Sequence, residues 1–190
     1  MIEVSSYNSG NTCGSTAAQT VASVTYNGIA AIAVPNSIAC ATKSGSSGVS
    51  QTQLFYLLNS SLPVAGGHTV VVTFNASTAS AVAGAISLTG VAQGGPEAVA
   101  TTASTSNVSS ISTSITTKTN GAWLVDVDGI GSASSTYSVG SGQTARWYVK
   151  SNSNAGGGST KPMTTAGATT MSWTSSGDKP MAQSVASFAP

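Results

Sequence analysis

Two aspartates separated by one residue are the most chemically suggestive feature of the chain. Asp126 and Asp128 lie in the segment LVDVDG, and residues two apart on a β-strand project from one face, roughly 7 Å apart. Such a pair can act in glycoside hydrolysis, where a retaining enzyme needs carboxyl groups about 5 to 5.5 Å apart, or can bind calcium, which takes about six to eight oxygens. The other acids are remote in sequence, so we interpret the pair as solvent-facing and keep calcium and catalysis as alternatives.

The chain has one histidine, His68, so it can build neither a triad with a second histidine in reserve nor a multi-histidine metal site. His68 stands at the start of the segment HTVVVTF, where we expect it to form a hydrogen bond at a strand end. With five acids and no nucleophile constellation, the sequence predicts no enzyme, no cofactor and no metal.

Three tryptophans, Trp123, Trp147 and Trp173, each lie in an apolar strand pattern, so we expect all three to pack in the core. Arg146, Trp147 and Tyr148 could instead form an aromatic platform for sugars. Alternation opposes this, because it points Trp147 to one face and its two neighbours to the other.

Charge is scarce throughout the chain. Charged residues make up 6% of it, against about 25% in typical soluble domains, and its six Lys and Arg residues are scattered rather than clustered. Nucleic-acid binding is therefore excluded. The longest aliphatic runs are far shorter than the roughly 18 residues that span a bilayer, so we expect no membrane insertion.

Cys13 and Cys40 are the only cysteines. They flank the first predicted hairpin, and we expect a disulfide between them, with two buried free thiols as the alternative. A disulfide would imply an oxidising compartment. Three sequons, at Asn59, Asn75 and Asn107, could accept N-linked glycan on an exported chain, although a chain so rich in Ser and Thr contains about that many by chance.

Alternating, β-branched segments recur along the chain and helical periodicity is absent, which predicts an all-β fold. The expected strands are 2–6, 20–26, 29–34, 51–58, 68–75, 80–89, 108–117, 121–128, 143–149, 168–174 and 181–188. About ten strands in one domain indicate a β-sandwich or jelly roll, Ig-like in general architecture.

Two loops are expected to differ in character. Asn27-Gly28 tolerates the positive φ angles of a type I′ turn, which predicts a tight hairpin between SVTY and IAAIAV. Residues 151–162, with three successive glycines, are expected to be the most flexible loop.

The order of the segments SVTYNG, QLFYLLN, HTVVVTF, AVAGAISLTGV, GAWLVDVDG, GQTARWYV and TMSWT resembles a β-sandwich module of secreted, surface and virion-associated proteins of microbes and phages. The resemblance runs from about residue 20 to the end of the chain. It implies a fold and an extracellular or cell-surface location, and it carries no catalytic residues.

One departure from this resemblance suggests a function. Such modules usually place a strongly apolar strand before the segment that matches SVTYNG, whereas here that space holds NTCGSTAAQTVA. We therefore expect a core strand to be absent from residues 13–190, the single β-sandwich domain. Residues 1–12 would be a strand and tether able to fill such a vacancy in another copy. The candidate exchange segment is Ile2, Glu3, Val4, Ser5 and Ser6, and the alternative is that these residues fill an edge of their own sheet.

We therefore expect a structural subunit of an extracellular filament, such as a pilus-like thread, or of another surface assembly, in which the chain is its own partner in a homopolymer. A surface with few titrating groups suffers little self-repulsion on close packing. The alternatives are a carbohydrate-binding or adhesive module, with glycans as partners, and a phage fibre or decoration protein.

Overall fold

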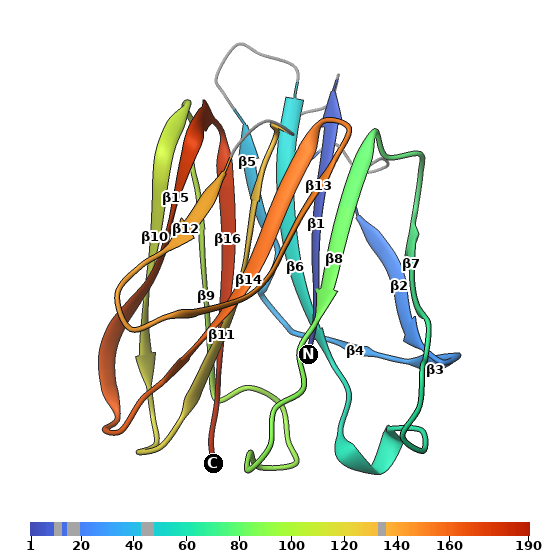
Figure 1. Ribbon diagram of the computed structural model, residues 1–190, viewed down its shortest axis with the longest axis vertical. Coiled ribbons are helices and arrows are strands. Elements are labelled where there is room, and N and C mark those ends of the chain that lie inside the picture. Colours follow the sequence, from blue (N-terminus) through green and yellow to red (C-terminus); the bar gives the residue numbers. More distant parts are fainter. Residues whose placement is uncertain (10–12, 15–19, 43–47, 133–135) are drawn as a thin grey trace.

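The computed structural model describes residues 1–9, 13–14, 20–42, 48–132 and 136–190. The described residues form 16 β-strands and one short 3-10 helix, η1 (Asn59–Ser61). None of their helices is long and apolar enough to cross a membrane. The strands form four antiparallel sheets, which Figure 1 shows side by side across the molecule.

We name each sheet after one of its strands. The β2 sheet holds β3 (Ile29–Ala30), β2 (Val21–Tyr26) and β7 (Val70–Phe74). The β1 sheet holds β4 (Ile32–Ala33), β5 (Ala39–Thr42), β6 (Gly48–Tyr56), β1 (Ile2–Ser9) and β8 (Ser80–Ala85). The β11 sheet holds β13 (Thr144–Ser151), β14 (Asn154–Pro162), β11 (Trp123–Ile130), β16 (Met181–Phe188) and β9 (Ala98–Ala103). The β15 sheet holds β10 (Val108–Thr117), β15 (Gly167–Lys179) and β12 (Tyr137–Val139).

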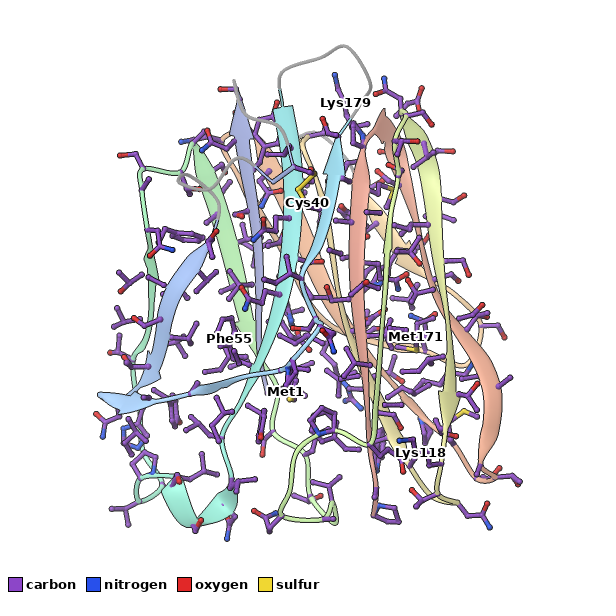
Figure 2. All side chains as sticks on the ribbon, turned by 180° about the vertical axis from the view of Figure 1, so that it is seen from behind. Met1, Cys40, Phe55, Lys118, Met171 and Lys179 are labelled. Atoms are coloured by element: carbon purple, nitrogen blue, oxygen red, sulfur yellow. A yellow bond between two sulfur atoms is a disulfide. The ribbon has the colours of Figure 1, made fainter. Side chains whose placement is uncertain are left out.

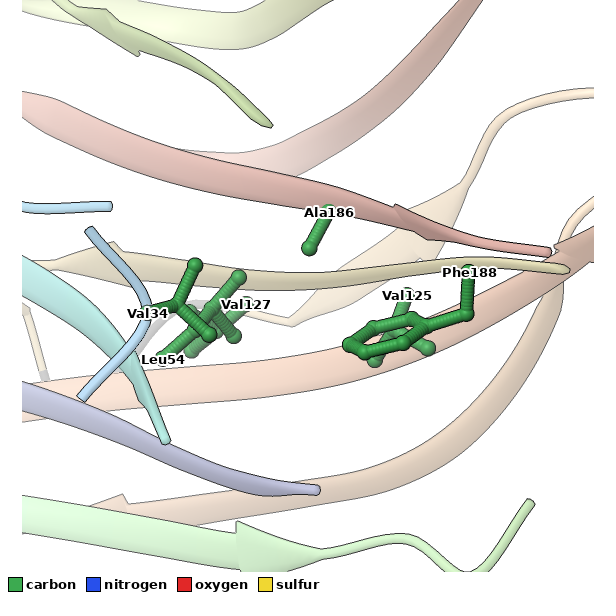
Figure 3. Packing of buried hydrophobic residues seen from close by; sticks show 6 residues of the cluster. All are labelled: Val34, Leu54, Val125, Val127, Ala186 and Phe188. Atoms are coloured by element: carbon green, nitrogen blue, oxygen red, sulfur yellow. The ribbon is translucent and has the colours of Figure 1, made fainter. Parts of the chain in front are cut away.

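Three apolar layers hold the four sheets together. Val4 and Phe55 of the β1 sheet pack against Val24 of the β2 sheet. The opposite face of the β1 sheet packs on the β11 sheet through the cluster drawn in Figure 3, which contains Val34, Leu54, Val125, Val127, Ala186 and Phe188. The β11 sheet packs in turn on the β15 sheet, where the buried residues are Ile111, Ile115, Leu124, Ile130, Ala155, Met171, Trp173, Met181 and Val185.

The all-β sandwich class is thus confirmed, with a stack four sheets deep. Because the β1 and β11 sheets are each covered on both faces, successive residues of their strands are buried alternately on opposite sides. Along β11, Val125 and Val127 face the β1 sheet while Leu124 faces the β15 sheet. This two-sided burial explains strands in which nearly every residue is inaccessible.

The predicted hairpin at Asn27-Gly28 is confirmed. Asn27 and Gly28 have φ angles of 51° and 78°, and the flanking residues Tyr26 and Ile29 lie opposite each other. The chain then leaves the β2 sheet and enters the β1 sheet, where Ile32 pairs with Tyr56 of β6. The predicted strand 29–34 is therefore divided between two sheets.

The expectation of a flexible loop at residues 151–162 is wrong. Residues 154–162 form β14, which lies between β13 and β11 and is buried over most of its length. A Cβ atom at Gly156 would lie 2.7 Å from Val82, and one at Gly157 would lie 2.8 Å from Trp173. The glycines thus permit close approach of the sheets on both faces of β14. The strands β5, β9 and β12 were also not predicted from the sequence.

Candidate assembly site: the groove filled by the N-terminal strand

The N-terminal strand lies at the centre of its own sheet. β1 pairs antiparallel with β6 along one edge and with β8 along the other, so that Val4 lies opposite both Gln53 and Ala83. All five residues of the candidate exchange segment, Ile2, Glu3, Val4, Ser5 and Ser6, are buried. In the single chain no strand position is therefore vacant here, and the expectation of an empty groove is wrong. Residues 2–6 do fill a place in their own sheet, at its centre rather than its edge.

The two faces of β1 differ in chemistry. Ile2 and Val4 pack in the apolar layer against the β2 sheet. Glu3 and Ser5 face the β11 sheet, where a Cβ atom on Gly158 would overlap the Glu3 carboxyl group and one on Gly129 would overlap the Ser5 hydroxyl group. Glycines of β11 and β14 thus form a channel that accepts the polar side chains of β1.

Glu3 is a fully buried acid on this strand. Its Oε2 atom accepts a hydrogen bond from Trp147 Nε1 of β13, and its Oε1 atom has no hydrogen-bond partner. Burial raises the pKa of Glu3 well above its ordinary value, and the nearby Asp126 carboxyl group raises it further. Docking of β1 therefore favours a protonated Glu3.

The interpretation of Asp126 and Asp128 as solvent-facing is wrong, since both are fully buried on the face of β11 toward the β15 sheet. Asp126 accepts hydrogen bonds from the Ser159 amide (2.9 Å) and hydroxyl (2.6 Å) groups, Trp173 Nε1 (2.8 Å) and Gln183 Nε2 (2.7 Å). Burial raises the pKa of Asp126 to about 6, although the hydrogen bonds from these donors lower it in part. The pair therefore belongs to the core of the fold.

Asp128 lies in a less complete environment. Burial raises its pKa well above the ordinary value, and the nearby Tyr137 hydroxyl group lowers it in part. Neither Asp128 oxygen has a hydrogen bond of regular geometry. Within the described ranges, no group of three or more His, Cys, Asp or Glu side chains is placed to bind a metal ion.

The predicted disulfide between Cys13 and Cys40 is confirmed, with their Cα atoms 5.8 Å apart. Cys40 belongs to β5, where it lies opposite Gln51 of β6, and Gln51 lies opposite Ser6 of β1. The disulfide thus fixes the chain that follows β1 close to the groove that β1 occupies. Figure 2 shows Cys40 and Met1 toward opposite ends of the molecule, so β1 runs toward the end that carries the disulfide.

The remaining candidate residues do not converge on one site. His68 precedes β7 and hydrogen-bonds the Val64 carbonyl oxygen at 2.7 Å, as expected for a residue at a strand end. Trp173 is fully buried, whereas Trp123 and Trp147 are half-buried. Because Trp147 is turned inward to Glu3, the aromatic platform proposed for sugars is not formed with it. Asn59 and Asn75 are exposed, and Asn107 is half-buried before β10.

The chain matches no family model, no curated protein and no solved structure. The function is therefore argued from the fold and from the groove around β1. Sequence reasoning missed the glycine channel, because glycines 129, 156 and 158 lie on two strands that no sequence pattern brings opposite β1. It also missed Trp147 as a partner of Glu3 across 144 residues of chain.

Proposed function

We propose that the protein is a structural subunit of an extracellular filament or surface assembly, in which β1 of one copy fills the groove between β6 and β8 of another. The placement of β1 supports this most directly. β1 is the first strand of the described residues and is joined to the rest of them only through the chain that follows it, yet it occupies a central position. Because β6 and β8 both run antiparallel to it, removing β1 leaves two parallel strands about 9.5 Å apart, too far for direct pairing.

Exchange between copies would preserve the contacts that β1 makes within one chain. The backbone ladders to β6 and β8, the apolar contacts of Ile2 and Val4, and the bond from Trp147 to Glu3 are available equally from a neighbour. Exchange of an identical element is therefore nearly neutral in contact energy and depends on concentration and chain reach.

The disulfide limits that reach. Four residue steps separate Ser9, the last residue of β1, from Cys13, so the tether spans at most about 14 Å. An exchanged β1 must therefore enter the neighbouring copy close to the disulfide of the copy that donates it. This entry point is the end of the neighbouring copy that carries its own disulfide. Subunits would meet through these ends. An open series of such exchanges gives a filament, whereas reciprocal exchange stops at two copies.

Two further properties fit an extracellular assembly. A disulfide is typical of oxidising compartments. A net charge of +1 over 190 residues leaves little long-range repulsion to oppose packing of many copies.

A chain locked in its closed form provides the test. Asn8 of β1 lies opposite Val49 of β6, so the double variant Asn8→Cys/Val49→Cys should form a second disulfide that holds β1 in its own sheet. Concentrated wild-type protein is expected to form filaments visible by electron microscopy, and the oxidised double variant is expected to form none. Wild-type protein that stays monomeric, or filaments formed equally by the locked chain, would contradict the proposal. Wild-type dimers that the locked chain does not form would show reciprocal exchange and would contradict the filament.

A further inference from the structure

The outermost β2 sheet carries no charge. Between Glu3 and Glu97 the only Asp, Glu, Lys or Arg residue is Lys43, which belongs to no strand of this sheet. The strands β2, β3 and β7 present only apolar side chains and hydroxyl groups. Val71 on β7 is 48% exposed, and Leu62 and Val64 in the preceding loop are 45% and 89% exposed.

β7 is an open edge of this sheet. It pairs with β2 on one side, and within the described residues no strand pairs with its other side. The Asn27 amide donates to the Thr69 carbonyl oxygen at 2.9 Å. Because bonding alternates along an antiparallel pair, Val71 and Thr73 bond to β2. The amide and carbonyl groups of Val70, Val72 and Phe74 therefore point outward, away from β2.

Two other edge strands in the described part of the chain, β13 and β9, are protected. β13 carries Arg146 and Lys150 and has an irregularity in its pairing between Ala145 and Trp147. β9 lies against β10, where the Thr102 hydroxyl group donates to the Ser112 carbonyl oxygen. Charges, bulges and covering elements are the usual means by which proteins block edge pairing. β7 carries no charged side chain, and the irregularity in its pairing with β2 lies on β2, between Val21 and Ser23.

We propose that the β7 edge is a contact surface for a second copy of this chain, through antiparallel pairing of β7 with β7 about a two-fold axis. The sequence of the edge is self-complementary in this arrangement. Centred on Val72, the pairing places Val72 opposite its counterpart, Val70 opposite Phe74, and Val71 opposite Thr73. All outward-pointing backbone groups then meet in hydrogen-bonded pairs. The inner faces of the two β2 sheets join into one continuous apolar face.

The chemistry of the edge favours a second copy over another partner. An edge without charge offers no electrostatic attraction to a charged ligand, and a two-fold contact requires only one surface that complements itself. This contact does not depend on strand exchange by β1, and in a filament it would link neighbouring subunits or neighbouring filaments side by side.

The contact is small. Five-residue edges bury much less than the roughly 1,200 Å² of a stable interface. The isolated pair should therefore be reversible and concentration-dependent, and many copies in an assembly would strengthen it by avidity.

The test uses the oxidised Asn8→Cys/Val49→Cys chain, in which β1 cannot exchange, so that failure of this proposal is separable from failure of the proposed function. Sedimentation equilibrium should show a monomer–dimer equilibrium. Val71→Lys should weaken the association at least tenfold by placing a cation on the edge, and the matched variant Val149→Lys, on the charged β13 edge where Val149 is 43% exposed, should leave it unchanged.

Two further measurements identify the surface. Amide hydrogen exchange at Val70 and Val72 should slow as the protein concentration rises, while exchange at Val71, already bonded to β2, should not change. Val72→Pro removes an outward-pointing amide without breaking the ladder to β2, and it should abolish dimerisation while the chain stays folded. A protein that stays monomeric up to about 1 mM, a concentration that corresponds to weak binding, would overturn the proposal. Equal effects of Val71→Lys and Val149→Lys on the association would also overturn it. So would association that leaves the amides of Val70 and Val72 unprotected from exchange.

Discussion

Replacing Gly129 by alanine should push β1 away from the β11 sheet. A Cβ atom at this position would overlap the Ser5 hydroxyl group and would lie 3.1 Å from Ser5 Cβ and 3.2 Å from Thr52 Cγ2. Gly129 does not have a positive φ angle, so the alanine backbone itself is not strained. Where space is available, a Gly-to-Ala change stabilises a protein by about 0.4 to 1 kcal/mol. Any loss of stability at Gly129 therefore reports the contact with β1.

The expected cost follows from overpacking of a closely packed layer, about 1 to 3 kcal/mol in free energy of unfolding. Ser5→Gly removes two of the three close contacts. Alone it should cost about 1 to 2 kcal/mol, because it deletes the hydrogen bond from Asn154 Nδ2 to Ser5 Oγ (3.2 Å) and loosens the strand. In the double variant Ser5→Gly/Gly129→Ala the overlap is absent, so its loss should be smaller than the sum of the single losses by about 1 to 3 kcal/mol.

Urea unfolding of the wild type, both single variants and the double variant measures this coupling. Gly94→Ala is the matched control, since no atom lies within 4 Å of a Cβ there, and it should stabilise the protein by about 0.4 to 1 kcal/mol. Additive losses in the double variant, or a Gly129→Ala variant as stable as Gly94→Ala, would refute the claim that β1 is seated in a glycine channel.

Three other predictions concern the buried acids and the disulfide. Raising the pH from about 4 to about 6 should lower the free energy of unfolding by about 2 kcal/mol through Asp126 alone, because its pKa rises from 3.8 in the unfolded chain to about 6 in the folded one. This contribution to stability is fully present when the pH is below the pKa of Asp126 in the unfolded chain, and it is lost as the pH rises through the pKa of Asp126 in the folded chain. A flat stability profile over this interval would be inconsistent with the burial of Asp126. Asp126→Asn should cost about 2 to 4 kcal/mol at pH 7 in thermal or urea unfolding, because an amide NH₂ group would face N–H donors; a loss under 0.5 kcal/mol would argue against the four hydrogen bonds. Reducing Cys13–Cys40, which closes a separation of 27 residues, should cost about 3.5 kcal/mol, and an unchanged urea midpoint after reduction would show that the bridge does not constrain the unfolded chain.

Parts of this fold were predictable because their causes are local. The Asn27-Gly28 hairpin depends on two adjacent residues that tolerate positive φ. The disulfide required only that the two cysteines flank a hairpin. Alternating β-branched segments sufficed to predict an all-β sandwich.

The buried acids were not predictable, because their partners come from other strands. The pattern LVDVDG indicates a strand with one polar face, and Asp126 becomes buried only because Ser159, Trp173 and Gln183 supply donors from three other strands. The glycines of β14 were equally ambiguous. A glycine run indicates flexibility when it is exposed and close sheet packing when it is covered on both faces, and that cover is supplied by residues such as Val82 and Trp173.

Mixing two variants that each carry one added cysteine tests the exchange of β1 most directly. Asn8→Cys places a thiol on β1 and Val49→Cys places one opposite it on β6, and each variant alone lacks the partner thiol. Exchange predicts a disulfide that joins the two variants in the mixture, formed well above the level seen when Asn8→Cys is mixed with Val64→Cys, a variant at a site 89% exposed. Cross-linking no greater than in that control, while the double variant forms its internal disulfide readily, would show that β1 remains in its own chain.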